Sequence, residues 1–138
     1  MARLFIFACS LVLCCAPAGA ASKAAEFLVR EQISQACEGS PGQIDPIAVV
    51  ERDLTGDGRI DLIISHDGIT CSNGSRSSFC GTQLCPVNFY VRRGGLLKRE
   101  HKMLGAKVTV GDGDIPEIQM TAVDGKPGTV KWNGQKFR

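Results

Sequence analysis

Apolar residues recur at helical spacing in the segment that follows Ser22. Six of them form one stripe along a helix: Ala25, Leu28, Val29, Ile33, Ala36 and Cys37. Ser22 can cap the first turn, and Gly39 followed by Pro41 ends the pattern. The pattern predicts one amphipathic helix whose apolar stripe packs against the rest of the chain.

Downstream of this helix, the pattern changes to the alternation that is typical of strands. In PVNFYVR, Val87, Phe89 and Val91 share one face and alternate with Asn88 and Tyr90. Further strands are expected at residues 47–52, 59–65, 96–104, 107–110, 117–123 and 129–132, separated by glycine-containing turns. We therefore predict an α+β fold, with the N-terminal helix packed on an antiparallel β-meander of about five to seven short strands.

Residues 1–20 carry a third pattern. Arg3 precedes the apolar run LFIFACSLVLCC, and Ala18 and Ala20 occupy the A-x-A positions of a cleavage site. This order is typical of a secretory signal peptide. We expect cleavage near Ala20, a single domain at 21–138, and a periplasmic or secreted location without a membrane span.

Cleavage would leave a nearly neutral domain. The 16 lysines and arginines less Arg3 leave 15, against 14 acidic residues, and this balance favours neither nucleic acid nor an anionic membrane as a partner. Nothing in the sequence calls for an oligomer, and we expect a monomer.

Four of the seven cysteines lie outside the predicted signal peptide: Cys37, Cys71, Cys80 and Cys85. An even number in a small exported domain predicts two disulfides, and a zinc site is the alternative. Three disulfide pairings are open. We favour Cys37 with Cys71, and Cys80 with Cys85 across the CGTQLC loop.

The stretch DLTGDGRIDLII, residues 53–64, places acids and glycines at regular intervals. Counted from Asp53, oxygen-bearing side chains fall at positions 1, 3, 5 and 9, and Gly58 falls at position 6. Calcium binds about six to eight oxygens on a sharply bent chain, and crowded carboxylates repel one another without a cation. We expect Ile60 to point inward and anchor the loop. A polar turn is the alternative, because Asp and Gly are favoured in turns.

This stretch resembles the D-x-[DN]-G-D-G-x-x-D-[LF] calcium loops of FG-GAP and related β-repeat proteins, in which a loop precedes a strand. The resemblance implies a set of calcium ligands: Asp53, Thr55, Asp57, the Arg59 carbonyl and Asp61. Thr55 departs from the usual Asp or Asn. More widely, residues 47–91, including SxFCGTxxCPV, resemble a group of small exported bacterial proteins of unknown role. That resemblance implies export and a similar layout, and supplies no activity.

Three functions fit these features. The leading hypothesis is a non-enzymatic calcium-binding module that contacts an envelope or extracellular protein or glycan. The first alternative is a small inhibitor or stress protein that acts through the 71–85 disulfide loop, with Phe79 as its anchor. The second alternative is a weak hydrolase that uses His66. No nucleophile-elbow or zinc-protease motif accompanies His66, and we expect an exposed histidine at a strand end.

Overall fold

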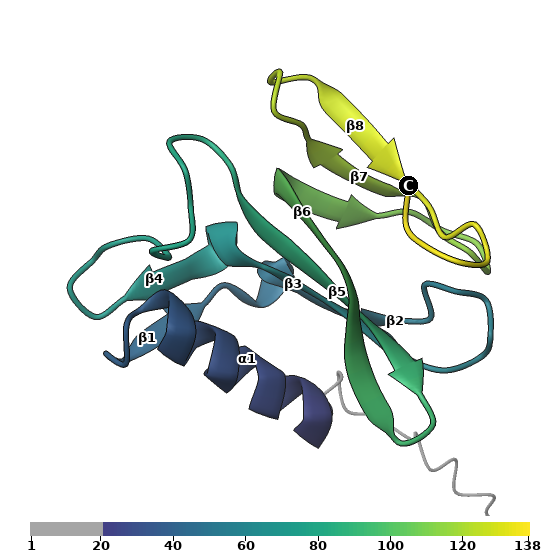
Figure 1. The fold of residues 1–138 in the computed structure, drawn as a ribbon, viewed down its shortest axis with the longest axis horizontal. Coiled ribbons are helices and arrows are strands. Elements are labelled where there is room, and N and C mark those ends of the chain that lie inside the picture. Colours follow the sequence, from purple (N-terminus) through teal and green to yellow (C-terminus); the bar gives the residue numbers. More distant parts are fainter. Residues whose placement is uncertain (1–20) are drawn as a thin grey trace, which may run out of the picture.

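The computed structural model describes residues 21–138, so the predicted signal peptide lies outside the described part. Within that part, one α-helix comes first and strands follow it (Figure 1). Their bounds are α1 (Lys23–Ala36), β1 (Gly42–Ile44), β2 (Val49–Arg52), β3 (Asp61–Ser65), β4 (Ile69–Cys71), β5 (Cys85–Arg93), β6 (Leu96–Val110), β7 (Ile118–Thr121) and β8 (Pro127–Val130). Two short 3-10 helices, η1 (Pro46–Ala48) and η2 (His66–Gly68), precede β2 and β4. Residues 21–138 contain no helix that is both long and apolar enough to cross a membrane.

The described strands form two antiparallel sheets. Six strands pair in the order β2-β3-β5-β6-β7-β8, while β1 and β4 pair with each other. The α+β class, with one helix and antiparallel strands, is confirmed. The strand order differs from an uninterrupted meander, because β4 leaves the large sheet to pair with β1.

Strand β6 also differs from the prediction of two strands at 96–104 and 107–110. Residues 96–105 of β6 pair with β5, and its last residues pair with β7. The change of partner is marked by an irregular register between Ala106 and Thr109, where Lys107 has a φ of 55°. Gly105 permits this crossing, because a Cβ there would lie 2.6 Å from the Met120 sulfur.

The helix begins as predicted. The Ser22 hydroxyl accepts a hydrogen bond from the Ala25 N–H at 3.2 Å, and Gly39, with a φ of 82°, follows the last turn. Ala25 and Ala36 of the expected stripe are buried. Gln32 is buried with them, which the apolar pattern did not predict.

Strand β3 is buried on both faces. On one face, Leu62 and Ile64 pack with Ala25 of α1. On the other face, Ile63 belongs to a second core, whose other buried members are Leu54, Val87, Phe89, Val91, Val108, Ile118, Met120, Trp132 and Phe137. Figure 1 shows the corresponding arrangement, with α1 on one side of β3 and β5 and the β7–β8 hairpin on the other. The predicted face of β5 is confirmed as part of this second core, since Val87, Phe89 and Val91 all lie in it.

The C-terminal residues complete the second core. Phe137 is 1% exposed, and its ring centroid lies 4.8 Å from that of Phe89 and 5.0 Å from that of Trp132. The backbone N–H and C=O of Arg138 both pair with Lys131. The last residues of the chain are therefore structural.

Both favoured disulfide pairings are confirmed. Cys37–Cys71 joins the end of α1 to β4, with 34 residues of sequence separation. Cys80–Cys85 closes the short loop before β5, with a separation of 5. The first disulfide thus connects distant elements, and the second constrains a local turn.

We expect the two disulfides to contribute unequally to stability. Replacing Cys37 and Cys71 with Ala should lower the free energy of unfolding by about 4 kcal/mol, because the longer loop gains more entropy in the unfolded chain. Replacing Cys80 and Cys85 with Ala should cost about 2 kcal/mol. Urea unfolding of the two double variants measures this difference, and an equal loss in both would contradict it.

Candidate functional site

The acidic loop connects β2 to β3 and folds around the carboxylate of Asp53. This carboxylate accepts hydrogen bonds from the N–H groups of Thr55 at 3.1 Å, Gly56 at 2.8 Å and Gly58 at 2.7 Å. Gly56 and Gly58 have φ angles of 75° and 80°, which glycine adopts without strain. Burial opposes ionisation of Asp53, but the N–H groups of Gly58, Gly56 and Thr55 outweigh it and lower its pKa.

Asp57 and Arg59 pair with each other on the outer side of the loop. The Arg59 N–H donates to one Asp57 oxygen at 2.9 Å, and the guanidinium donates to the other at 2.9 and 3.1 Å. The backbone N–H of Arg59, followed by its guanidinium, lowers the pKa of Asp57. Both side chains are partly exposed, so the pair contributes little to stability.

Asp61, the first residue of β3, is fully buried. Its two oxygens accept hydrogen bonds from the Leu54 N–H at 2.9 Å and the Arg92 N–H at 2.8 Å, which ties the loop to β5. Burial raises the pKa of Asp61 above its usual range, these two N–H groups oppose that rise, and the charges of Asp57 and Asp53 add to it.

The expected role of Ile60 as the inward anchor is wrong. Ile60 is 47% exposed, whereas Leu54 is fully buried and lies in the second core. The reason is that Asp61 takes the inward position, so the adjacent Ile60 points outward. The loop is anchored by one apolar side chain, Leu54, and one carboxylate, Asp61.

The fit of this loop to calcium depends on which oxygens remain free. In residues 21–138, no three His, Cys, Asp or Glu side chains are gathered into a metal cluster. The Thr55 hydroxyl, however, is buried and makes no hydrogen bond of ordinary geometry, although its proximity to the Asp57 carboxylate lowers the pKa of that group. A buried oxygen of this kind lacks the partner that buried polar groups normally have, and a cation could provide it. The calcium site stays a prediction.

A second polar cluster surrounds His66, which follows β3 directly. His66 Nδ1 lies 2.9 Å from the Ser77 hydroxyl, and Nε2 lies 2.8 Å from the Gln32 side-chain oxygen. Asn88 Nδ2 donates to the same Gln32 oxygen at 2.8 Å. Asn88 Nδ2 also lies 3.2 Å from His66 Nε2, so both amide side chains surround this ring nitrogen while Ser77 contacts the other.

His66 is 1% exposed, so the expectation of an exposed strand-end histidine is wrong. Burial and, secondly, the nearby positive charge of Lys102 lower its pKa to about 4, against the opposing effect of the Asp67 charge. Ser77, at 3% exposed, is equally enclosed. The cluster therefore joins α1, the disulfide loop and β5 in one buried polar network, and the use of His66 in a hydrolase stays a prediction.

The sequence contained a signal for this cluster. Gln32 stands at helical spacing between Val29 and Ala36, so a polar side chain occupies a core position of the apolar stripe. Asn88 similarly lies on the face of β5 that carries buried Tyr90. Buried polar groups require partners, and the Gln32 oxygen provides one for both His66 and Asn88, while Asn88 Oδ1 has none in the described structure.

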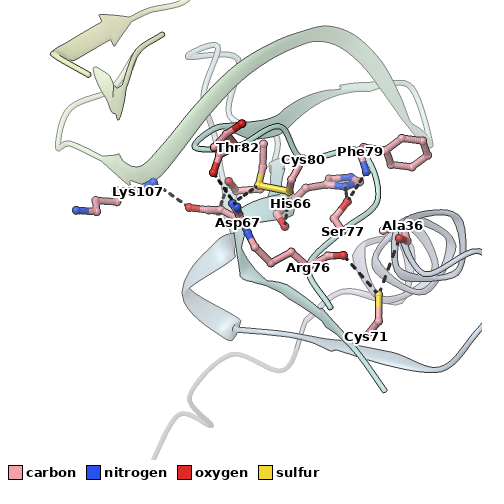
Figure 2. Close-up of a disulfide and its surroundings, with 12 residues drawn as sticks. Ala36, His66, Asp67, Cys71, Arg76, Ser77, Phe79, Cys80, Thr82 and Lys107 are labelled. Carbon is pink, nitrogen blue, oxygen red and sulfur yellow. Dashed lines mark hydrogen bonds between the residues drawn. A yellow bond between two sulfur atoms is a disulfide. The ribbon is translucent and has the colours of Figure 1, made fainter. Parts of the chain in front are cut away.

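The disulfide loop places Phe79 at the surface beside this cluster, as Figure 2 shows. Phe79 is 49% exposed, and one edge of its ring contacts His66 with 5.7 Å between ring centroids. It lines a hollow of about 510 Å³ together with Leu104 and Val123, which are 51% and 75% exposed. Lys102 Nζ lies 5.9 Å from the Phe79 ring centroid.

The comparisons with known proteins found no relative of this chain. The chain matches none of the protein-family models, curated proteins or solved structures with which it was compared.

We expect His66 to make the protein sensitive to mild acid. Its folded pKa of about 4 lies below the usual value of 6.5, so the unfolded chain binds the proton first as the pH falls. Stability should be complete above pH 6.5 and should decline by about 3 kcal/mol toward pH 4. Urea unfolding across this range measures the decline.

The matched controls are His66→Gln, which should flatten this decline, and His101→Gln, which should retain it. Titration of the His66 ring by NMR in the unaltered protein tests the pKa directly. A pKa near 6.5 for His66 would overturn the expectation even if the His66→Gln variant fails to fold.

Proposed function

We propose that this chain is an exported, non-enzymatic calcium-binding module that contacts an envelope or extracellular partner. The residues that would hold calcium are Asp53, Thr55, Asp57 and Asp61, with the Arg59 carbonyl. Bound calcium would cross-link the loop and would take no part in a chemical reaction.

One observation carries the calcium proposal: Asp61 is a fully buried carboxylate whose ionisation is opposed by both Asp53 and Asp57. In the described part of the chain, the basic side chains form no ion pair with Asp61. A divalent cation would offset the repulsion among the three carboxylates, and it would also give the Thr55 hydroxyl a partner.

Export is supported by the two disulfides, because such bonds form and persist in oxidising compartments. The A-x-A pattern that ends at Ala20, after an apolar run, adds the sequence signature of a cleaved signal peptide. We therefore place the mature chain at 21–138, in the periplasm or outside the cell.

Calcium should stabilise the protein, and loss of one ligand should remove that response. At a dissociation constant of about 1 mM, calcium at about 10 mM adds roughly 1.4 kcal/mol, which corresponds to an increase of about 5 °C in Tm. Asp57→Ala should abolish the increase, because its partly exposed carboxylate can be removed without opening the core. Thermal melts with calcium and with chelator measure the response.

Asp112→Ala is the matched control, since Asp112 is an exposed acid in a separate turn. It should retain the full calcium response. An unaltered protein that melts at the same temperature with calcium and with chelator, and takes up none in calorimetry, would show that residues 53–61 form a hydrogen-bonded turn only.

A second candidate function is inhibition or binding of a partner protein through the disulfide loop. The exposed apolar side chains of Phe79, Leu104 and Val123 around one hollow favour it. Lys102 beside Phe79 adds a positive charge, so we assign the partner a surface that combines an apolar side chain with a carboxylate.

Phe79→Ala should abolish capture of this partner with little change in Tm, because Phe79 is already 49% exposed. Phe27→Ala is the matched control: Phe27 is a 61% exposed phenylalanine on α1 and should remain neutral. Lys102→Glu should weaken capture in a salt-dependent manner. Affinity capture from an envelope extract, followed by calorimetry with the purified partner, gives the readout. Equal binding by the Phe79 and Phe27 variants would refute this surface.

A further inference from the structure

The two disulfides have different surroundings. Cys37 and Cys71 are both buried, at 6% and 5% exposure, and their bond lies in a cluster with Ala36 and Ile69. The Cys71 sulfur lies 3.9 Å from the Ala36 carbonyl oxygen, a simple contact because an oxidised sulfur carries no proton. This disulfide is shielded from thiols in solution.

Cys80–Cys85 is asymmetric. The Cys80 residue is partly exposed and lines the hollow beside Phe79, while Cys85 is fully buried at the start of β5. Cys80 is therefore the more accessible residue of the pair, and its sulfur lies 3.8 Å from the His66 carbonyl oxygen. Access of this kind determines which sulfur of a disulfide is attacked.

The side chain of Arg76 lies against the sulfur of Cys85. One guanidinium nitrogen, Nη2, lies 3.0 Å from the Cys85 sulfur, and the other, Nη1, donates to the Thr82 carbonyl at 3.4 Å (Figure 2). The positive charge is thus held against the sulfur that would leave as a thiolate. A neighbouring cation lowers the pKa of a thiol, and a thiol of lower pKa leaves faster.

From this arrangement we propose that Cys80–Cys85 is an exchange-active disulfide, opened by attack of a thiol on Cys80 with Cys85 leaving under the charge of Arg76. The incoming thiol loses its proton to solvent, and its sulfur forms a new S–S bond with Cys80. The Cys80–Cys85 bond breaks, and its electron pair remains on Cys85 as a thiolate. A second thiol can then release Cys80, so that two thiols are oxidised to one disulfide as the protein disulfide is reduced to a dithiol.

The substrate class is a thiol small enough to enter the hollow of about 510 Å³, or a cysteine on a protruding segment of a partner protein. The site is separate from the calcium loop and uses none of its residues. Its success or failure is therefore independent of calcium binding.

The test is partial reduction of the oxidised chain, residues 21–138, with limiting glutathione. Samples are quenched with acid, alkylated, and mapped by mass spectrometry. We expect Cys80 and Cys85 to open at least about tenfold faster than Cys37 and Cys71. The first intermediate should carry glutathione on Cys80 and the alkyl group on Cys85.

Arg76→Gln should slow this opening by roughly threefold to tenfold, and Arg76→Lys should restore part of the rate. Arg30→Gln, at an exposed position on α1, is the matched control and should react as the unaltered chain does. In a Cys80→Ser background, Arg76→Gln should also raise the pKa of the Cys85 thiol, measured by thiolate absorbance. A purely structural role for Arg76 would leave that pKa unchanged.

Three results would overturn the proposal. The first is opening of Cys37–Cys71 at the same rate as Cys80–Cys85. The second is glutathione on Cys85 in the first intermediate, and the third is an Arg76→Gln chain that exchanges as fast as the unaltered protein.

Discussion

Burial of β3 on both faces is the constraint on which the rest of the structure depends. Its five residues are all buried, with Leu62 and Ile64 toward α1 and Ile63 toward the second core. Removal of this much apolar surface from water is the dominant favourable term in folding. Because β3 lies between β2 and β5 in the large sheet, its position also fixes the strands on either side.

Both polar sites are attached to the ends of this strand. Asp61 begins β3 and holds the acidic loop against Arg92 of β5, while His66 follows β3 and meets Gln32 of α1. Because β3 is buried on both faces, it holds Asp61 and His66 in place, and each of these polar groups keeps one set of hydrogen-bond partners. The loop and the histidine cluster are thereby positioned by the same apolar residues, although they differ in chemistry and in exposure.

The sequence predicted the features that depend on local pattern. Spacing of apolar residues located α1 and the inward face of β5, and Ser22 identified the helix start. It did not predict that β6 would continue past Gly105, because this depends on contact with Met120, a residue distant in the chain. It also missed the burial of His66, since its partners at Gln32 and Ser77 come together only through tertiary packing. Ile60 was misplaced for the same reason: a carboxylate took the inward position that an apolar residue was expected to fill.

The position of Phe137 has a consequence for how the chain reaches this state. The Phe137 ring completes the second core, and it contacts Phe89, which lies 48 positions earlier in the sequence. A contact between such distant residues must first close a long loop of chain, and this closure costs entropy. We therefore expect the second core to close after local elements such as α1 and the β7–β8 hairpin have formed.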